Sequence, residues 1–159
     1  MVEKKTIKRT IELKVFTFDS LSEELKKLCQ EAQKSALNAY AVYSKFRVGA
    51  AVLLEDNTII TGNNQENIAY PSGLCAERTA LFYTHSQFPD KKIKAIAIYS
   101  PDATSLLTPC GACRQVMIEY ENLQNVPIAT LLVTNNDEVY ILSSSKDWLP
   151  FEFNERSLK

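Results

Sequence analysis

Two short cysteine motifs carry the residues in this sequence whose types and spacing are best suited to chemistry. One motif is Cys-Ala-Glu at 75–77, and the other is Cys-Gly-Ala-Cys at 110–113. Together they offer three thiolates and one carboxylate. A structural zinc is normally closed by four protein ligands, whereas a catalytic zinc keeps three and leaves a position for water or substrate. The motifs therefore predict a catalytic zinc held by Cys75, Cys110 and Cys113, with Glu77 free to move protons.

Cys29 and His85 are the other side chains that zinc would favour. Cys29 lies far upstream in a helical pattern, where a small packed hydrophobe is the expected role. His85 stands ten residues after Cys75 without a partner at ligand spacing. Three of the four cysteines fall in metal-type motifs, which fits a reducing compartment better than a disulfide framework. We therefore expect a cytoplasmic protein.

The composition limits the kinds of partner. The 159 residues, 45% of them hydrophobic, predict one core and a single domain over 1–159. Eighteen basic and nineteen acidic residues leave a net charge of −1, which argues against nucleic acid or an anionic membrane as partner. The sequence has no apolar run near the roughly 20 residues that span a bilayer. The charged start at 1–10 lacks the apolar core of a signal peptide. A small molecule is the expected partner.

Hydrophobic periodicity predicts an α/β domain in which helices flank a central mixed sheet of about five strands. Residues 1–20 add an extra strand or arm, because apolar residues alternate over 7–15. Ser20 and Glu23 are spaced as a capping box for the first helix. The predicted strands lie at 47–54, 58–62, 94–99, 128–134 and 138–142, and the predicted helices lie at 21–39, at 75–88 and from about 110 onward.

Both cysteine motifs thus open a helix, where the partial positive charge of the N-terminus stabilises thiolate over thiol. Positions 110 and 113 face the same side of the first turn, so both sulfurs can reach one ion. Three thiolates over-neutralise Zn²⁺, and a nearby cation should compensate. Two cations are available, because Arg78 directly follows Glu77 and Arg114 directly follows Cys113. We favour Arg78 as the residue that donates a hydrogen bond to a cysteine sulfur.

Five motifs occur in order along the chain. They are Tyr-Ser-Lys-Phe-x-Val-Gly-Ala-Ala at 43–51, Asn-x-Glu-Asn-x-x-Tyr at 64–70, Cys-Ala-Glu-Arg-Thr-Ala at 75–80, Pro-Cys-Gly-Ala-Cys-Arg-Gln-Val at 109–116 and Leu-Pro-x-x-Phe at 149–153. Together they resemble the small zinc-dependent cytidine deaminases, and the similarity runs from about residue 30 to 153. The resemblance implies the three-layer cytidine-deaminase-like fold. It also implies hydrolysis of cytidine and 2′-deoxycytidine to uridine and 2′-deoxyuridine with release of ammonia, as in pyrimidine salvage.

In that chemistry Glu77 would take the proton of a zinc-bound water as hydroxide attacks C4 of the pyrimidine, and then return protons to N3 and the departing amine. Asn64 and Glu66 match the pair that binds the ribose. Glu66 would also repel a phosphate, so nucleosides are expected over nucleotides. Phe46 would contact the base, and the Ala76 amide would read its edge.

The resemblance also implies a homotetramer with shared active sites, in which Phe153 reaches the site of a neighbouring subunit. Val42, Gln65, Ile68 and Pro71 depart from the family pattern around the substrate pocket. Two other functions stay open. One is a related aminohydrolase such as a blasticidin-type deaminase, and the other is a non-catalytic binding module that zinc stabilises. Loss of turnover with retained zinc in Glu77→Ala would separate an enzyme from a binding module.

Overall fold

A six-stranded mixed sheet forms the middle of the molecule. The computed structural model describes residues 1 and 3–158, and its strands follow the order β1-β6-β5-β4-β2-β3. β4 and β5 pair in parallel, and every other neighbouring pair is antiparallel. The strands are β1 (Leu13–Thr17), β2 (Gly49–Leu54), β3 (Ile59–Asn63), β4 (Ile93–Tyr99), β5 (Ala129–Val133) and β6 (Glu138–Leu142).

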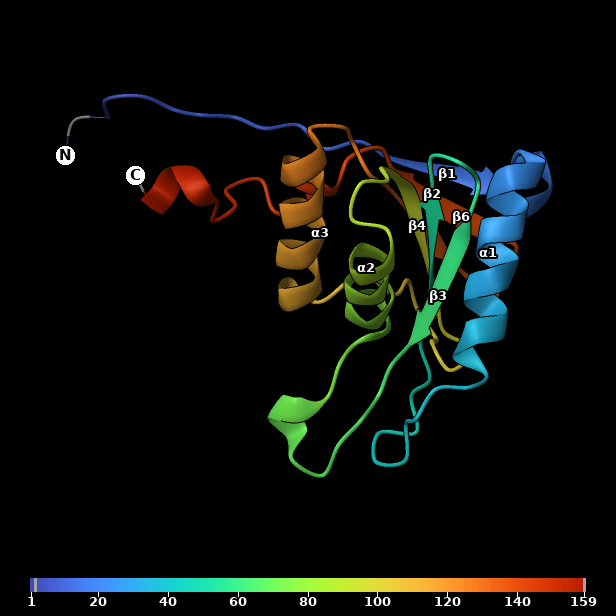
Figure 1. Ribbon diagram of the computed structural model, residues 1–159. Helices are drawn as coiled ribbons and strands as arrows, with labels where there is room; N and C mark the ends of the chain where they lie inside the picture. Colours follow the sequence, from blue (N-terminus) through green and yellow to red (C-terminus); the bar gives the residue numbers. More distant parts are fainter. Residues whose placement is uncertain (2, 159) are drawn as a thin grey trace.

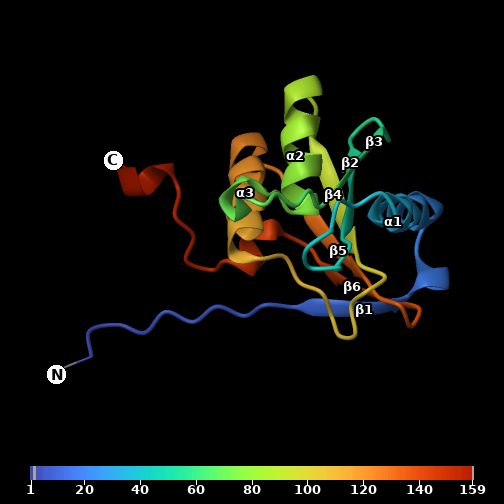
Figure 2. The ribbon, with the colours of Figure 1, turned by 90° about the horizontal axis from the view of Figure 1, so that it is seen from below.

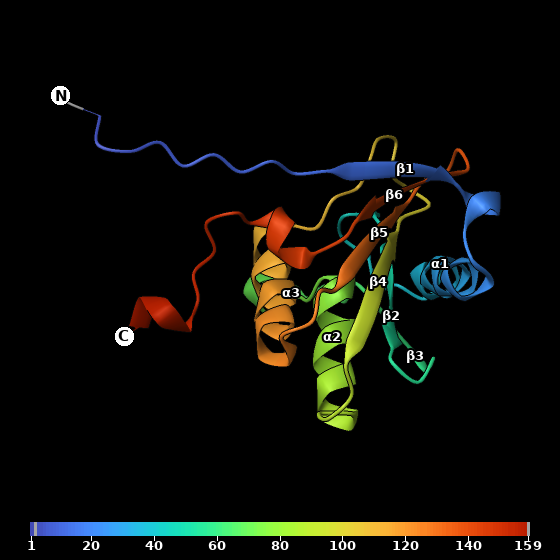
Figure 3. The same cartoon turned by 90° about the horizontal axis from the view of Figure 1, so that it is seen from above.

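Three helices cover the sheet and complete the three-layer architecture. α1 (Glu23–Ala36) lies on one face, and α2 (Ala76–Gln87) and α3 (Gly111–Gln124) lie side by side on the other (Figures 1 and 3). This arrangement confirms the expected α/β class. The sheet has six strands because the N-terminal arm contributes β1 beyond the five strands expected of the central sheet.

Alternate side chains of the central strands fill two separate cores. Val52 of β2 and Ile96 of β4 pack toward α2 and α3, whereas Leu53 packs toward Leu28 of α1. All six residues of β2 are buried. A strand that is covered on both faces requires apolar residues in a continuous run, which is why the sequence around β2 lacks alternation.

Two glycines let the helices approach the sheet closely. A Cβ atom on Gly49 would lie 2.1 Å from the carbonyl oxygen of Ala32 in α1. A Cβ atom on Gly62 would lie 2.5 Å from the backbone nitrogen of Ala80 in α2. The second contact matters for function, because it sets the position of the helix that begins just after Cys75.

Two sequence predictions at the N-terminus are wrong in detail. The arm pairs with β6 only through Leu13–Thr17, and Ile7 and Ile11 precede the strand and are exposed. The alternation over 7–15 is misleading because β6 has only five residues to pair with. The N-cap of α1 is Ser22, whose hydroxyl accepts a hydrogen bond from the Leu25 amide at 3.4 Å, and not Ser20.

Both termini extend beyond the three layers, past α3 (Figures 1 and 2). The Arg9 guanidinium lies 5.9 Å from the centre of the Phe151 ring, so the N-terminal arm touches the C-terminal tail. Nearer the core, a short 3₁₀ turn at Ser145–Trp148 packs against α3. None of the helices in the described part of the chain has the length and apolar character needed to cross a membrane.

Candidate active site

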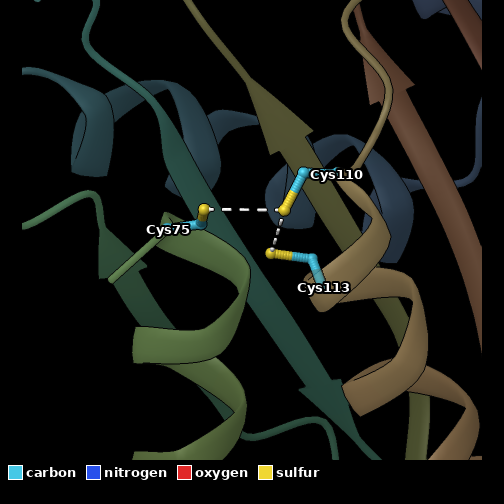
Figure 4. A group of neighbouring side chains, drawn as sticks. All are labelled: Cys75, Cys110 and Cys113. Atoms are coloured by element: carbon cyan, nitrogen blue, oxygen red, sulfur yellow. Dashed lines mark hydrogen bonds between the residues drawn. The ribbon is translucent and has the colours of Figure 1, made fainter. Parts of the chain in front are cut away.

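Three cysteine sulfurs meet where α2 and α3 begin (Figure 4). Cys75 is the N-cap residue of α2, Cys110 is the N-cap residue of α3, and Cys113 lies in the first turn of α3. The Sγ atoms of Cys75 and Cys110 are 3.8 Å apart, and those of Cys110 and Cys113 are 3.5 Å apart. All three sulfurs lie within 4.8 Å of one another.

The sulfur triangle has the size that zinc requires. A tetrahedral ion with Zn–S bonds of about 2.3 Å separates its sulfurs by about 3.8 Å. The observed spacings are close to this value without any rearrangement of the helices. The donor set of the described residues therefore fits a zinc ion with three thiolate ligands and one position left for another molecule.

The thiols of the triangle do not share charge equally. The pKa of Cys75 is lowered to about 5 by a hydrogen bond from Cys113 and by the Arg78 guanidinium, against the opposing effect of burial. The pKa of Cys113 is raised by the same hydrogen bond and by burial. The group is therefore organised around a thiolate at Cys75, and a divalent cation would allow the other thiols to ionise as well.

The two candidate arginines lie in different surroundings. Nη2 of Arg78 donates to Cys75 Sγ at 3.7 Å. Arg114 instead donates through Nε to the Pro109 carbonyl at 2.7 Å, and its guanidinium lies 5.0 Å from the centre of the Trp148 ring. Arg78 thus contacts the sulfur group, while Arg114 supports the chain that leads into α3.

Glu77 lies in the first turn of α2 and is only 5% exposed. Its pKa is raised to about 7, chiefly by burial and further by the negative charge of Cys75. A carboxyl group with this pKa exchanges protons readily near neutral pH. Burial next to the sulfur triangle is therefore the physical basis for expecting proton transfer at Glu77 rather than a surface role.

An open groove of about 530 Å³ runs from the sulfur site along the loops that precede α2. Asn64 and Glu66 line it together with Cys75 and Arg78. Tyr43 and Tyr70 form its aromatic wall, with ring centres 6.1 Å apart in an edge-to-face arrangement. Both tyrosines belong to motifs of the sequence, at 43–51 and 64–70, but nothing in a single sequence separates a groove-lining tyrosine from a packed one.

Asn64 and Glu66 also hold the neighbouring loop in place. The Asn64 side chain accepts from the Val48 amide at 2.8 Å and donates to the Phe46 carbonyl at 2.9 Å. The Glu66 carboxylate accepts from the Tyr43 amide at 2.7 Å and from the Ser44 amide at 3.3 Å. The two residues predicted to bind ribose are thus brought together, and each already makes backbone hydrogen bonds.

The other predicted substrate residues do not line this groove in the described chain. Phe46 is partly buried beside it, and Ala76 is fully buried at the start of α2. Phe153 is 60% exposed in the C-terminal tail, where its carbonyl accepts a hydrogen bond from Gln115 at 2.8 Å. Cys29 is buried in the core between the sheet and α1, on the other face of the sheet, as a packed residue should be.

The layered fold, the three convergent thiols and the buried glutamate define the class of metal-dependent deaminases. Comparison with known proteins places the chain within that class. The chain belongs to the family described as the cytidine and deoxycytidylate deaminase zinc-binding region, which matches residues 22–130.

Similar proteins cover most of the chain. A cytidine deaminase of Sporosarcina psychrophila is 48% identical over 99 residues, which are 62% of this chain and 71% of the relative. A probable cytidine deaminase of Dictyostelium discoideum is 38% identical over 137 residues, covering 86% of this chain and 88% of the relative. The crystal structure of a cytidine deaminase from Burkholderia pseudomallei is similar with a TM-score of 0.73 and 35% identity, over 84% of this chain and all of that chain.

Proposed function

We propose that the protein is a zinc-dependent cytidine deaminase that converts cytidine and 2′-deoxycytidine into uridine and 2′-deoxyuridine with release of ammonia. One observation carries the proposal. Three sulfurs within 4.8 Å of one another adjoin a buried glutamate, and one of them, that of Cys75, lines an open groove. The relatives named as cytidine deaminases support the choice of substrate.

Cys75, Cys110 and Cys113 would hold the zinc. A bound ion would supply Lewis-acid chemistry, lowering the pKa of a water molecule so that it can act as a nucleophile near neutral pH. The two helix N-termini and Arg78 offset the negative charge of the three thiolates. This compensation is needed because three thiolates make a site less electrophilic than one with neutral ligands.

Glu77 moves the protons of the reaction. With a pKa of about 7, its carboxylate accepts a proton from the attacking water and returns protons to N3 of the ring and to the departing amine. The buried position keeps bulk water from competing for these protons. Glu77 lies on the first turn of the helix that Cys75 begins and interacts with Cys75 and Cys113, so it adjoins the metal position.

The substrate contacts come from the groove and the loops around it. Asn64 keeps one amide hydrogen free after its bond to Phe46, and Glu66 keeps acceptor capacity on its carboxylate, so both bind ribose hydroxyls. Phe46 contacts the base, and the Ala76 amide reads its edge. The negative charge of Glu66 favours nucleosides over nucleotides.

The active protein is a homotetramer of single-domain chains, each spanning 1–159 with residues 1–20 as an arm. Large apolar side chains stay exposed around the groove, including Ile68 at 74% and Tyr70 at 73%. A soluble monomer rarely leaves such a patch uncovered. Phe153, exposed in the tail, is the residue that completes the site of a neighbouring subunit.

The enzyme acts in pyrimidine salvage in the cytoplasm and has no nucleic-acid or membrane partner. The supporting arguments are its net charge of −1 and its four free thiols, which a reducing compartment preserves.

The test is to mix zinc-loaded protein with cytidine and to follow ultraviolet absorbance and ammonia release. Deoxycytidine, cytosine, cytidine monophosphate and adenosine are run beside it. We expect turnover of the two pyrimidine nucleosides only. Glu77→Ala should keep zinc and lose activity by roughly 10²- to 10⁴-fold. Zinc binding without turnover of any of these compounds would contradict the proposal and favour another substrate or a binding module.

A further inference from the structure

The loop at residues 43–48 lies beside the groove and has no helix or strand, yet each of its backbone N–H groups donates a hydrogen bond. Side chains accept most of them, and this keeps an irregular segment rigid. The acceptors, in order from Tyr43 to Val48, are Glu66 for the first two, the Ala41 carbonyl, the Ser44 hydroxyl, Asp102 and Asn64.

Asp102 differs from the other side-chain acceptors because it belongs to a different loop. Asn64 and Glu66 belong to the segment after β3, whereas Asp102 belongs to the loop that leads from β4 to the zinc ligand Cys110. It accepts from the Arg47 backbone amide at 2.9 Å and from the Arg47 guanidinium at 2.9 and 2.7 Å. One carboxylate therefore binds both the main chain and the side chain of the residue after Phe46.

The loop that carries Asp102 is itself held in place. Asn135 donates through Nδ2 to the Ser100 carbonyl at 3.3 Å and to the Ala103 carbonyl at 3.1 Å, on either side of Asp102. The Asp102 amide donates to the Ser100 hydroxyl at 3.2 Å. Asp102 is thus held in place, and its two carboxylate oxygens, through their hydrogen bonds to Arg47, also hold the 43–48 loop in place.

We propose that Asp102 is a positioning residue for substrate binding, which sets Phe46 at a defined place relative to the zinc ligands by holding Arg47. This role rests on the proposed function, in which Phe46 contacts the base. Without Asp102, the 43–48 loop loses the hydrogen bonds that, among the described residues, join it to the metal-bearing loop.

Stability alone does not account for this pair. The side chains of Arg47 and Asp102 are 42% and 25% exposed, and ion pairs this open contribute little to folding. A bidentate arginine–carboxylate pair instead adds geometric precision. The pKa of Asp102 is lowered to about 2 by the Arg47 guanidinium and its backbone amide, so the pair is fully charged at neutral pH. Removal of the Arg47–Asp102 pair should therefore weaken substrate binding.

The experiment compares zinc-loaded wild type, Asp102→Ala, Arg47→Gln and the control Asp56→Asn. The control breaks a similar ion pair, Asp56 with Lys91, which lies in the turns at the other end of β2 and β4. Cytidine KM and kcat are measured, and the binding constant of uridine is obtained by calorimetry. For Asp102→Ala we expect KM and the uridine dissociation constant to rise roughly tenfold with kcat within about threefold of wild type.

Arg47→Gln keeps the backbone bond to Asp102 and should show a smaller rise in both constants, while Asp56→Asn should match wild type. If Asp102→Ala fails to fold, the rise in Arg47→Gln decides the matter. Unchanged KM and uridine affinity in these variants would overturn the positioning role, as would a loss confined to kcat and melting temperature. A wild type that neither deaminates cytidine nor binds uridine would overturn the proposed function itself and this role with it.

Discussion

Nη2 of Arg78 lies 3.7 Å from Sγ of Cys75. Cys75 is the N-cap residue of α2, and Arg78 follows it by one helical turn. The Nε atom of Arg78 is buried and has no hydrogen-bond partner among the described atoms, whereas Nη2 of the same guanidinium donates to the sulfur. A fixed cation therefore stands next to the thiolates. It offers the charge compensation that a three-thiolate zinc site requires.

Replacing Arg78 should change the pH dependence of the reaction. In Arg78→Gln we expect the acidic limb of the kcat/KM profile to move to higher pH by roughly one unit, because a nearby cation favours ionised groups. The profile is measured on protein that still holds one zinc per chain. Arg114→Gln is the matched control, since in the described part of the chain Arg114 contacts Pro109 and Trp148 and does not hydrogen-bond to the sulfurs. An unchanged profile in Arg78→Gln would exclude charge compensation by this residue.

Zinc removal should destabilise the protein, because the metal joins the beginnings of α2 and α3. With free zinc at a thousand times its dissociation constant, the linkage stabilises the fold by about 4 kcal/mol. A strong chelator should therefore lower the melting temperature clearly. Cys113→Ser should behave like chelated wild type, while Cys29→Ala, altered in the other core, should keep full zinc content. Equal melting temperatures with and without chelator would rule out a bound metal at this site.

Gly49 and Gly62 should tolerate no side chain. Alanine at either position places Cβ within 2.5 Å of helix backbone, and backbone atoms cannot move aside individually. We expect each substitution to cost about 3 kcal/mol in the free energy of unfolding, measured by urea denaturation. Gly111→Ala is the matched control because its Cβ meets nothing within 4 Å. Equal stability of all three variants would mean that α1 and α2 can shift without cost.

Glu121 should be a structural carboxylate. It is 2% exposed and accepts from the amides of Ile128 and Ser145 at 2.9 and 2.7 Å, tying α3 to the start of β5 and to the 3₁₀ turn. Glu121→Ala leaves two buried donors unpaired and should cost about 3 kcal/mol. The exposed Glu119→Gln on the same helix should stay within about 0.5 kcal/mol of wild type. A small effect at Glu121, measured by thermal denaturation, would show that other acceptors replace it.

Asp56 should make a small contribution to stability, because its ion pair with Lys91 is exposed, and only above acidic pH. Its pKa is lowered from 3.8 to about 2 by a hydrogen bond from Lys91 and by the Thr58 amide. Because the folded state holds this proton more weakly than the unfolded chain, the stabilisation is complete above about pH 4 and is lost as pH falls toward 2. The melting temperature of Asp56→Asn should therefore lie below wild type at pH 6 and converge with it near pH 2. A constant difference across this range would assign the effect to something other than ionisation.

Much of the site follows from local sequence patterns. The cysteine spacing and the helical periodicity after each motif act over a few residues, so the positions of Cys75, Cys110 and Cys113 at helix beginnings are predictable without a structure. The positions of the five central strands along the chain follow in the same way, because buried strands require apolar runs. The extent of β1 does not, since it depends on how many residues β6 offers for pairing.

Tertiary structure alone decides which distant groups meet. No spacing rule pairs Arg47 with Asp102, which are 55 positions apart, and none tells that Asn64 and Glu66 already bind the 43–48 backbone. These contacts depend on the order of strands in the sheet, in which β2 lies between β4 and β3. By itself the sequence determined the chemistry of the thiols and the carboxylate, because that chemistry belongs to residue types and local spacing. The fold determined which of those groups are buried, charged and already engaged, because burial and charge depend on neighbours from the whole chain.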